Sequence, residues 1–252
     1  MIRNAVIFVL ASVMIVRADQ AADTLTAAGV AEFTAAYQAW DGERFGKAAE
    51  YFRQAEEKSP SSAINQYWRG VALFHRMLQV QSMQAPTAAM DAMDAALAPL
   101  EASVTLDPSN AESHALLGTL YGMKIGGSIF RAIRYGPTVQ SHQQKALKYG
   151  PMNPRVRYLL GAGQYNTAKD AAARREARDT LLAAEKLFNS EARQPVTGFE
   201  PRWGYSSCLT FIARAYESLG EMRAAQNYYR MAHAAHPADQ RAMDGINRTQ
   251  GK

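Results

Sequence analysis

Small and large apolar residues recur at fixed offsets in the last part of the chain, within residues 209–237. Ala213 and Ala225 are small, and bulky apolar residues follow each of them at helical spacing. Apolar residues that recur every three or four positions predict amphipathic helices. Gly220 can adopt positive φ and end the first helix, and Pro237 cannot continue the second. The stretch therefore predicts two helices joined by a turn.

The same register recurs earlier in the chain. Asn153-Pro154 predicts a helix start, with Asn as the N-cap and Pro inside it. The pattern Ser-x-x-Glu at residues 109–112 predicts a capping box that opens another helix. The matching small, large and closing positions are Ala48, Phe52, Ala55, Pro60, Gly70, Ala96, Leu100, Ser103, Pro108, His114, Leu117, Gly118, Tyr121, Leu160 and Gly161.

This register resembles the tetratricopeptide repeat (TPR), a helix-turn-helix of about 34 residues. Leu209 stands at the position of the family's Trp, Ile212-Ala213 at its Leu-Gly pair, and Pro237 at its terminal Pro. The resemblance implies an all-α, right-handed superhelical solenoid of about five repeats with a C-terminal cap helix. An ordinary helical bundle with coincidental spacing is the alternative. The repeats fall at about 29–60, 61–108, 109–151, 152–195 and 203–237 within a domain of residues 19–252, and the cap helix at 238–248.

The cap helix is expected to be apolar on one face and polar on the other. Its apolar face holds Ala238, Ala242, Met243 and Ile246. Its outward polar face is expected to hold Asp239, Arg241, Asp244 and Arg248.

Two repeats are longer than the family pattern. Between Gly70 and Ala96 the family spacing of about 12 residues is exceeded by roughly 14. We predict that both helices of this repeat are extended by about two turns and that Pro86 starts the second. The other insertion covers residues 122–137, where Gly126-Gly127 interrupts the helical pattern.

Ile125, Ile129 and Ile133 in the second insertion recur at i, i+4 and i+8, with basic residues around the same turns. A basic amphipathic element of this kind can touch a membrane or a partner. The commoner arrangement, which we expect here, is an extended hairpin whose apolar face packs on neighbouring helices. The basic residues are Lys124, Arg131 and Arg134.

Residues 1–18 are typical of a secretory signal peptide. Arg3 precedes an apolar run at residues 5–16 that is too short to span a bilayer comfortably. We predict cleavage after Ala18, with Ala21 as a second possible cleavage point and an uncleaved anchor as the alternative. The mature chain is then expected to be periplasmic or secreted, with no other segment apolar enough to span a membrane.

Charge and composition narrow the chemistry. Removing residues 1–18 takes away two basic residues and no acidic ones, so the net charge falls from +5 to +3. A charge this small gives little reason to expect nucleic-acid binding.

The single cysteine, Cys208, is expected to be a small apolar filler. His233 and His236 are expected to be solvated. No catalytic, metal or cofactor motif is found, so we predict a protein that is not an enzyme and carries no cofactor.

In TPR proteins the first helix of each repeat lines a concave groove. Carrying these offsets over implies a surface of aromatic rings with polar tips, which suits a peptide or a small ligand. Arg155 could pair with a carboxylate such as a peptide C-terminus, and about half of the groove tyrosines are expected to pack between repeats instead. The predicted groove residues are Tyr67, Phe74, His75, Arg155, Tyr158, Tyr165, Asn166, Arg214 and Glu217.

The leading functional hypothesis is therefore a scaffold of the bacterial cell envelope that binds a protein or peptide in its groove. The alternative is a small-molecule-binding accessory of a solute transporter. Asn153-Pro154-Arg155, followed by Leu159-Leu160-Gly161 and Pro201-x-Trp203-Gly204, resembles exported bacterial TPR proteins such as the TatT-like T components of TRAP transporters. A glycine pair that those proteins often carry is replaced here by residues 166–170.

Overall fold

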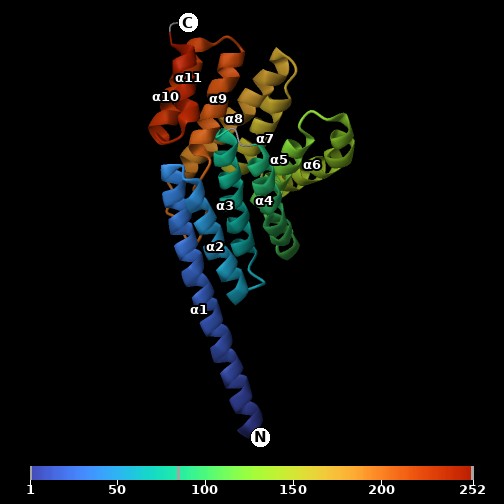
Figure 1. Cartoon of the computed structure of the whole chain (residues 1–252), viewed down its shortest axis with the longest axis vertical. Helices are drawn as coiled ribbons and strands as arrows, with labels where there is room; N and C mark the ends of the chain where they lie inside the picture. Colours follow the sequence, from blue (N-terminus) through green and yellow to red (C-terminus); the bar gives the residue numbers. More distant parts are fainter. Residues whose placement is uncertain (1, 84–85, 251–252) are drawn as a thin grey trace. The chain divides into compact units, whose positions relative to one another are not determined.

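The computed structural model describes the backbone of residues 2–83 and 86–250 and the side chains of residues 19–83 and 87–250. The regular elements in these ranges are α-helices, which follow one another as helix-turn-helix pairs (Figure 1). The predicted all-α architecture of paired helices is confirmed. The chain divides into two compact units, an N-terminal unit of Met1–Pro108 and a C-terminal unit of Ser109–Lys252.

The N-terminal unit contains two helix pairs, in which α1 packs on α2 and α3 packs on α4. Helix α2 also packs on α3, so the four helices share one core. Asp41 caps α2 by accepting hydrogen bonds from the backbone N–H groups of Glu43 and Arg44. The helices are α1 (Ile2–Ala39), α2 (Gly42–Lys58), α3 (Ala63–Ser82) and α4 (Pro86–Leu106).

Helix α1 extends well before residue 29, where the first repeat was expected to begin. Ala22 and Thr26 are buried, and Thr26 Oγ1 lies 2.6 Å from Asn65 Oδ1 on α3. A Cβ at Gly29 would lie 2.6 Å from the Phe52 ring, so α1 and α2 approach closely there. The sequence pattern missed this part of the repeat because its small and large positions depart from the family register.

The second repeat has the two long helices that its spacing predicts. Helix α3 contains 20 residues and α4 contains 21, and Pro86 is the first residue of α4. A Cβ at Gly70 would lie 2.5 Å from Leu100, so the small residue marks the point where the two helices meet. Because the extra turns extend both helices, they lengthen the repeat without adding another element.

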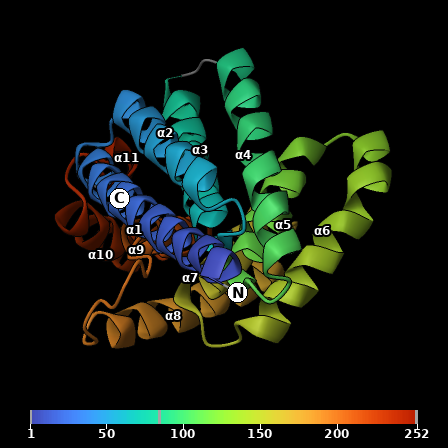
Figure 2. The same cartoon turned by 90° about the horizontal axis from the view of Figure 1, so that it is seen from below.

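The C-terminal unit contains three helix pairs and a last single helix (Figure 2). The first helices of successive pairs contact one another, α5 with α7 and α7 with α9, and α11 packs on α10 and α9. The helices are α5 (Ala111–Ile125), α6 (Ile129–Tyr149), α7 (Pro154–Thr167), α8 (Ala171–Glu191), α9 (Tyr205–Ser218), α10 (Met222–Ala235) and α11 (Gln240–Thr249).

Most of the predicted helix ends in this unit are confirmed. Asn153 caps α7 with Pro154 directly inside it, and Gly220 has a φ of 80° after α9 ends. The capping box predicted at Ser109 is wrong. Asn110, one residue after Ser109, is the N-cap of α5, and its side-chain oxygen accepts a hydrogen bond from the backbone N–H of Ser113.

The cap helix α11 follows the predicted apolar pattern, and Asp244 and Arg248 are exposed as predicted, but Asp239 is not. Ala242 and Ile246 are buried, and Gly245 lies directly against the Tyr229 ring. Asp239 was expected to face outward but is buried, because it caps α11 and forms an ion pair with Arg241 at 2.6 Å. Arg241 also donates to Ser207 Oγ at 3.2 Å, so the Asp239–Arg241 pair is linked to α9.

The apolar face in residues 122–137 does not pack on neighbouring helices, contrary to expectation. Gly126 and Gly127 adopt positive φ and separate α5 from α6. Ile129, Phe130 and Ile133 in the first turns of α6 are exposed. Only the other side of α6 faces α5, so these three side chains point away from the unit.

The predicted signal peptide, residues 1–18, lies outside the described side chains, and its cleavage stays a prediction. Among the helices searched over the described residues, none combines the length and apolar character that crossing a bilayer requires.

Candidate functional site

Three of the predicted groove residues lie in the interior of the N-terminal unit. Tyr67, Phe74 and His75 are each at most 3% exposed. His75 Nδ1 lies 2.8 Å from the carbonyl oxygen of Val71, and because a carbonyl only accepts, this nitrogen carries the proton. The His75 ring is surrounded by the rings of Phe33, Tyr37, Trp40, Phe45 and Phe74. These residues pack the core, and a role in binding stays a prediction.

Arg155 lies at the centre of a buried ion-pair network in the C-terminal unit. Its side chain is 4% exposed. Its Nε donates to Glu112 Oε1 at 2.7 Å, and its two terminal nitrogens donate to the two Glu191 oxygens at 2.9 and 2.6 Å. Asn153 Nδ2 donates to the same Glu112 oxygen at 2.7 Å. The network therefore joins α5, the start of α7 and the end of α8.

In this geometry the Arg155 guanidinium pairs with two carboxylates of the chain itself. Bidentate pairing of a guanidinium with a carboxylate is a strong, directional interaction. A peptide carboxylate at Arg155 would have to displace Glu191 or Glu112. From the sequence, Arg155 was expected to pair with a carboxylate such as a peptide C-terminus. In the structure it pairs with two carboxylates of the chain itself, 36 and 43 residues away, and peptide binding there stays a prediction.

A second group of predicted residues does come together at the surface of α7 and α9. The Arg214 guanidinium stacks over the Tyr165 ring at 5.1 Å and over the Phe211 ring at 5.0 Å. The Tyr165 and Phe211 rings lie 5.9 Å apart in an edge-to-face arrangement. All three side chains are partly exposed. We call Tyr165, Phe211 and Arg214 the aromatic platform.

Neighbouring residues frame the aromatic platform. Tyr158 is buried beneath it, with its ring 6.1 Å from that of Phe211. Asn166 is exposed near the end of α7. Phe211 was missed because the family offset selects Thr210, which is buried. The spacing of Phe211 and Arg214 at i and i+3 places them on one helix face and is a signal that could have found it.

Glu217, the last predicted groove residue, is directed toward the cap helix. Tyr229 Oη donates to Glu217 Oε2 at 2.5 Å, and Arg248 on α11 donates to both Glu217 oxygens at 3.2 Å. Burial and then the hydrogen bond to the Glu217 carboxylate raise the pKa of Tyr229. These contacts hold α9, α10 and α11 together.

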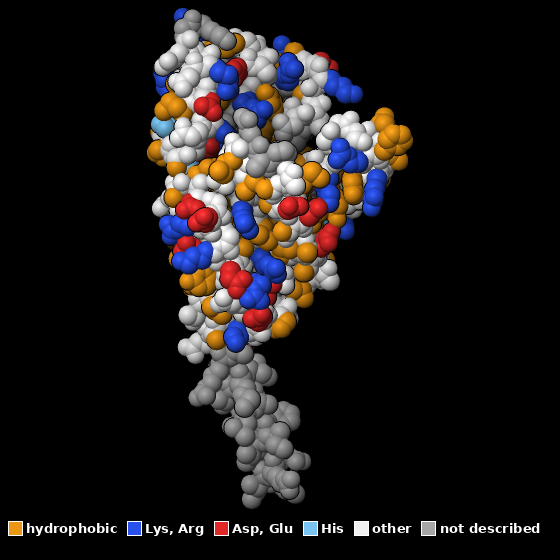
Figure 3. Space-filling model, in the orientation of Figure 1, with side chains coloured by type: hydrophobic (Ala, Val, Ile, Leu, Met, Phe, Trp, Pro, Cys, Tyr) orange, Lys and Arg blue, Asp and Glu red, His pale blue; other side chains and the backbone are white. Residues whose placement is uncertain are grey.

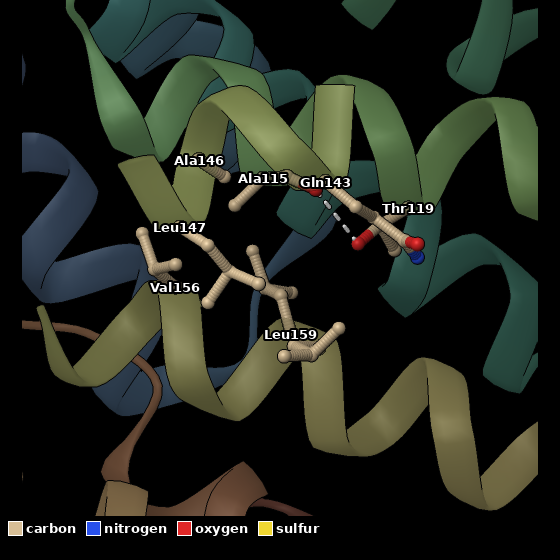
Figure 4. A pocket seen from close by; sticks show the side chains of 8 residues that line it. Ala115, Thr119, Gln143, Ala146, Leu147, Val156 and Leu159 are labelled. Carbon is tan, nitrogen blue, oxygen red and sulfur yellow. Dashed lines mark hydrogen bonds between the residues drawn. The ribbon is translucent and has the colours of Figure 1, made fainter. Parts of the chain in front are cut away.

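A small pocket lies between α5, α6 and α7 (Figure 4). Its free volume is about 10 Å³, which is room for one water molecule. The polar groups in its wall are those of Thr119, whose Oγ1 donates to the carbonyl of Ala115 at 2.9 Å, and Gln143. This pocket is too small for an organic solute, so it lends no support to a small-molecule function. It is lined by Ala115, Thr119, Gln143, Ala146, Leu147, Val156, Leu159 and Leu160.

The described residues contain no group of three or more His, Cys, Asp or Glu side chains that could hold a metal ion. His236 is buried, so the expectation of a solvated His233–His236 pair is wrong for His236, which lies where the chain turns from α10 toward α11. Cys208 is fully buried as expected, and burial raises the pKa of its thiol.

A sequence model of the family described as regulator of microtubule dynamics protein 1-3 (RMD1-3) matches residues 33–248. The chain belongs to the RMD1-3 family. A search of the curated proteins found no match.

Two solved structures show the fold of this RMD1-3 family member. One is the thermophilic TPR protein TTC0263 of Thermus thermophilus, with 16% identity, a TM-score of 0.60, and coverage of 88% of this chain and 98% of that one. The other is the APC/C hetero-tetramer Cut9-Hcn1, with 15% identity, a TM-score of 0.60, and coverage of 96% and 39%. The fold is TPR-like, as the sequence predicted.

Proposed function

We propose that this RMD1-3 family member is a non-enzymatic, TPR-like scaffold that binds a protein partner through the first-helix face of α7 and α9. The observation that carries the proposal is the aromatic platform, where two rings and a guanidinium are stacked within about 6 Å. The TPR-like fold and the family description, which concerns regulation of a protein polymer, both support a protein partner.

The chemistry of the aromatic platform suits a peptide with an acidic group beside an apolar one. Tyr and Arg are enriched among the residues that dominate interface energetics. A guanidinium that stacks on a ring by its face keeps its N–H edge available for a carboxylate. The partly exposed rings offer contact area with few rotatable bonds, so they lose little entropy on binding.

The test is capture of partners from an extract of the native host, with the wild type compared to Phe211→Ala and Arg214→Glu. Truncation of a hot-spot residue costs about 2 kcal/mol or more of binding free energy, so we expect both variants to lose the specifically captured proteins. Arg223→Glu, at an exposed position on α10, makes the same charge change and should capture them normally.

Thermal melts of all variants separate loss of binding from loss of fold. Unaltered capture by a folded Arg214→Glu variant would show that the partner binds elsewhere.

The cellular location is a separate proposal. We propose export with cleavage after Ala18, supported by Arg3, the apolar run at residues 5–16 and the small residue at 18. We expect the mass of the protein purified from its native host to correspond to a chain that begins at Asp19. A mass that includes residues 1–18 would exclude cleavage and leave the alternative, a chain held at the membrane by an uncleaved anchor.

A further inference from the structure

The outer end of the α5–α6 hairpin presents large apolar side chains to solvent. Gly126 and Gly127, with φ of 49° and 77°, turn the chain after α5, and α6 begins at Ile129. Ile129, Phe130 and Ile133 are 71%, 81% and 72% exposed. We call these three residues the apolar tip. Exposed apolar area that forms a contiguous patch marks an interaction surface more often than single exposed residues do.

The three side chains of the apolar tip share one face of α6. Because helical residues are about 100° apart, they lie within an arc of about 100°. The opposite side of the helix faces α5, where the Tyr135 ring lies 5.7 Å from that of Tyr121. Further along α6 the outward positions become polar, at Gln140 and Gln144. The apolar surface is therefore confined to the end of the hairpin.

Basic side chains surround the apolar tip. Arg131 and Arg134 are exposed beside it. The Arg134 guanidinium and Lys124 Nζ lie 5.2 and 5.9 Å from the centre of the Tyr135 ring, so one aromatic ring holds both cations near the tip. Figure 3 shows hydrophobic and basic side chains gathered at this end of the hairpin.

The charge around the apolar tip is of a single sign over a long stretch. Residues 113–150, which cover α6 and all but the first two residues of α5, contain five Lys and Arg residues and no Asp or Glu. The net charge of the whole chain is only +5, so this stretch is far more basic than the average. A surface of this charge is complementary to an anionic one.

We propose that the apolar tip and its flanking Lys124, Arg131 and Arg134 dock the C-terminal unit on an anionic phospholipid surface. Phe130, Ile129 and Ile133 enter the boundary between headgroups and acyl chains, and the three basic side chains contact lipid phosphates. Apolar residues beside Lys and Arg bind such interfaces by burial of apolar area together with attraction to anionic lipid.

The shape of the tip favours a lipid surface over a protein groove. Side chains that are more than 70% exposed project from the helix instead of lining a hollow. A fluid interface can surround projecting side chains, whereas a protein partner would need a matching pocket. The polar positions that follow on α6 limit insertion to the end of the hairpin, which fits the shallow depth of about 5–10 Å of interfacial helices.

Vesicle flotation of the full chain tests the proposal. We expect binding to phosphatidylcholine vesicles that contain about 30% phosphatidylglycerol to be stronger than to phosphatidylcholine alone. Phe130→Ser with Ile133→Ser, and separately Arg131→Glu with Arg134→Glu, should each weaken binding to the anionic vesicles by about tenfold or more.

Matched control variants change the same properties elsewhere. Met90→Ser with Val196→Ser removes two apolar side chains that are each 60% exposed. Arg175→Glu with Arg223→Glu makes the same charge change at exposed positions on α8 and α10. Both controls should bind the anionic vesicles within about twofold of the wild type. Equal loss in the controls and the tip variants would overturn the proposal.

A fluorescent reporter reads insertion of the tip itself, which matters because residues 1–18 are also apolar. Phe130→Cys provides an exposed thiol for an environment-sensitive dye, while Cys208 is fully buried and resists labelling. We expect the dye emission to shift to the blue and increase with anionic vesicles, and a dye at Val196→Cys to stay unchanged. If the emission of the dye at residue 130 did not change with anionic vesicles, the proposal would be overturned. The same holds if the emission shifted on addition of a host-cell extract but not on addition of vesicles.

Discussion

At the scale of single residues, glycines in equivalent helices of two repeats differ in how tightly they are packed. A Cβ at Gly118 would lie 3.4 Å from Gln143 Cγ, an ordinary contact, whereas a Cβ at Gly161 would lie 2.7 Å from Leu181 Cγ and 3.3 Å from the Leu181 backbone nitrogen. The sequence pattern identified both glycines as repeat positions, and Gly118 faces Gln143 and His142 of α6. It could not rank the two glycines, because the tightness depends on the Leu181 side chain.

We predict opposite effects of alanine at the two glycines. Gly118→Ala should leave the stability equal or raise it by up to about 1 kcal/mol, because alanine favours helix over glycine. Gly161→Ala should lower it by about 1–2 kcal/mol, since overpacking outweighs that gain. Gly118→Leu should also destabilise, by on the order of 1–3 kcal/mol. Urea denaturation measures all three, and a Gly161→Ala variant as stable as the wild type would contradict the close crossing.

A histidine pair in the C-terminal unit is expected to make its stability depend on pH. His114 Nδ1 and His142 Nδ1 lie 2.9 Å apart, so one nitrogen donates and the other accepts. Burial first, then the nearby His114 and Lys145, lower the pKa of His142 to about 4. The unfolded chain, with a pKa near 6.5, takes up this proton at higher pH than the folded chain. The contribution of His142 to stability is therefore expected to be complete above about pH 6.5 and to fall as the pH drops toward 4.

We predict a loss on the order of 1–2 kcal/mol between pH 7 and pH 4.5, because one pKa unit corresponds to about 1.4 kcal/mol and the partly exposed ring is partly screened. His142→Gln keeps a hydrogen-bonding side chain that does not titrate, so this component of the pH dependence should disappear. His233→Gln on α10 removes a histidine elsewhere and should retain it. Denaturation at a series of pH values compares the three proteins, and an unchanged pH profile in His142→Gln would contradict the assignment.

At the scale of helices, the sequence predicted the number and pairing of elements better than the contacts that join them. Repeat spacing placed the long α3 and α4 and the turn at Gly220, because local sequence sets helix length and termination. The same spacing could not show that Arg155 meets Glu112 and Glu191, since those residues come from other helices. The N-cap of α5 at Asn110 was missed by one residue because two suitable caps stand side by side.

We predict that the ion pairs of Arg155 contribute more to the free energy of unfolding than a surface ion pair does. Arg155→Met leaves the carboxylates of Glu112 and Glu191, 9% and 17% exposed, without their central cation, and removing one partner of a buried pair typically costs about 3–5 kcal/mol. Adding Glu112→Gln and Glu191→Gln should recover part of this loss, because no buried charge is then left. Denaturant melts measure both steps.

Arg178→Met is the matched control for Arg155→Met. Arg178 pairs with Asp179 and Glu221, whose side chains are 64% and 47% exposed, so its loss should cost less than about 1 kcal/mol. Equal destabilisation by Arg155→Met and Arg178→Met would show that the buried network contributes no special stability.

At the scale of the whole molecule, the overall net charge and the repeat pattern did not predict the local charge and burial of individual segments. The net charge of the whole chain did not reveal that every charged residue in the stretch 113–150 is basic. Of the predicted groove residues, Tyr165 and Arg214 come together at a surface, whereas Tyr67, Phe74 and His75 fill a core. The position of a residue within the repeat predicts which face of its helix it lies on. It does not predict whether a neighbouring helix covers that face.

The described part of α1 begins to pack on its unit only after residue 18. Ala22 is the first buried side chain among those described, and Thr26 and Gly29 continue the contact with Asn65 and Phe52. A chain that begins at Asp19 keeps all of these contacts, so we expect its melting temperature to match that of the full chain. A chain that begins at Ala31 lacks them and should lose about 2 kcal/mol or more of stability. Circular dichroism melts of the two shortened chains make the comparison. If the chain that begins at Asp19 were as destabilised as the shorter one, residues 1–18 would be a structural part of the N-terminal unit, and their removal on export would be incompatible with its fold.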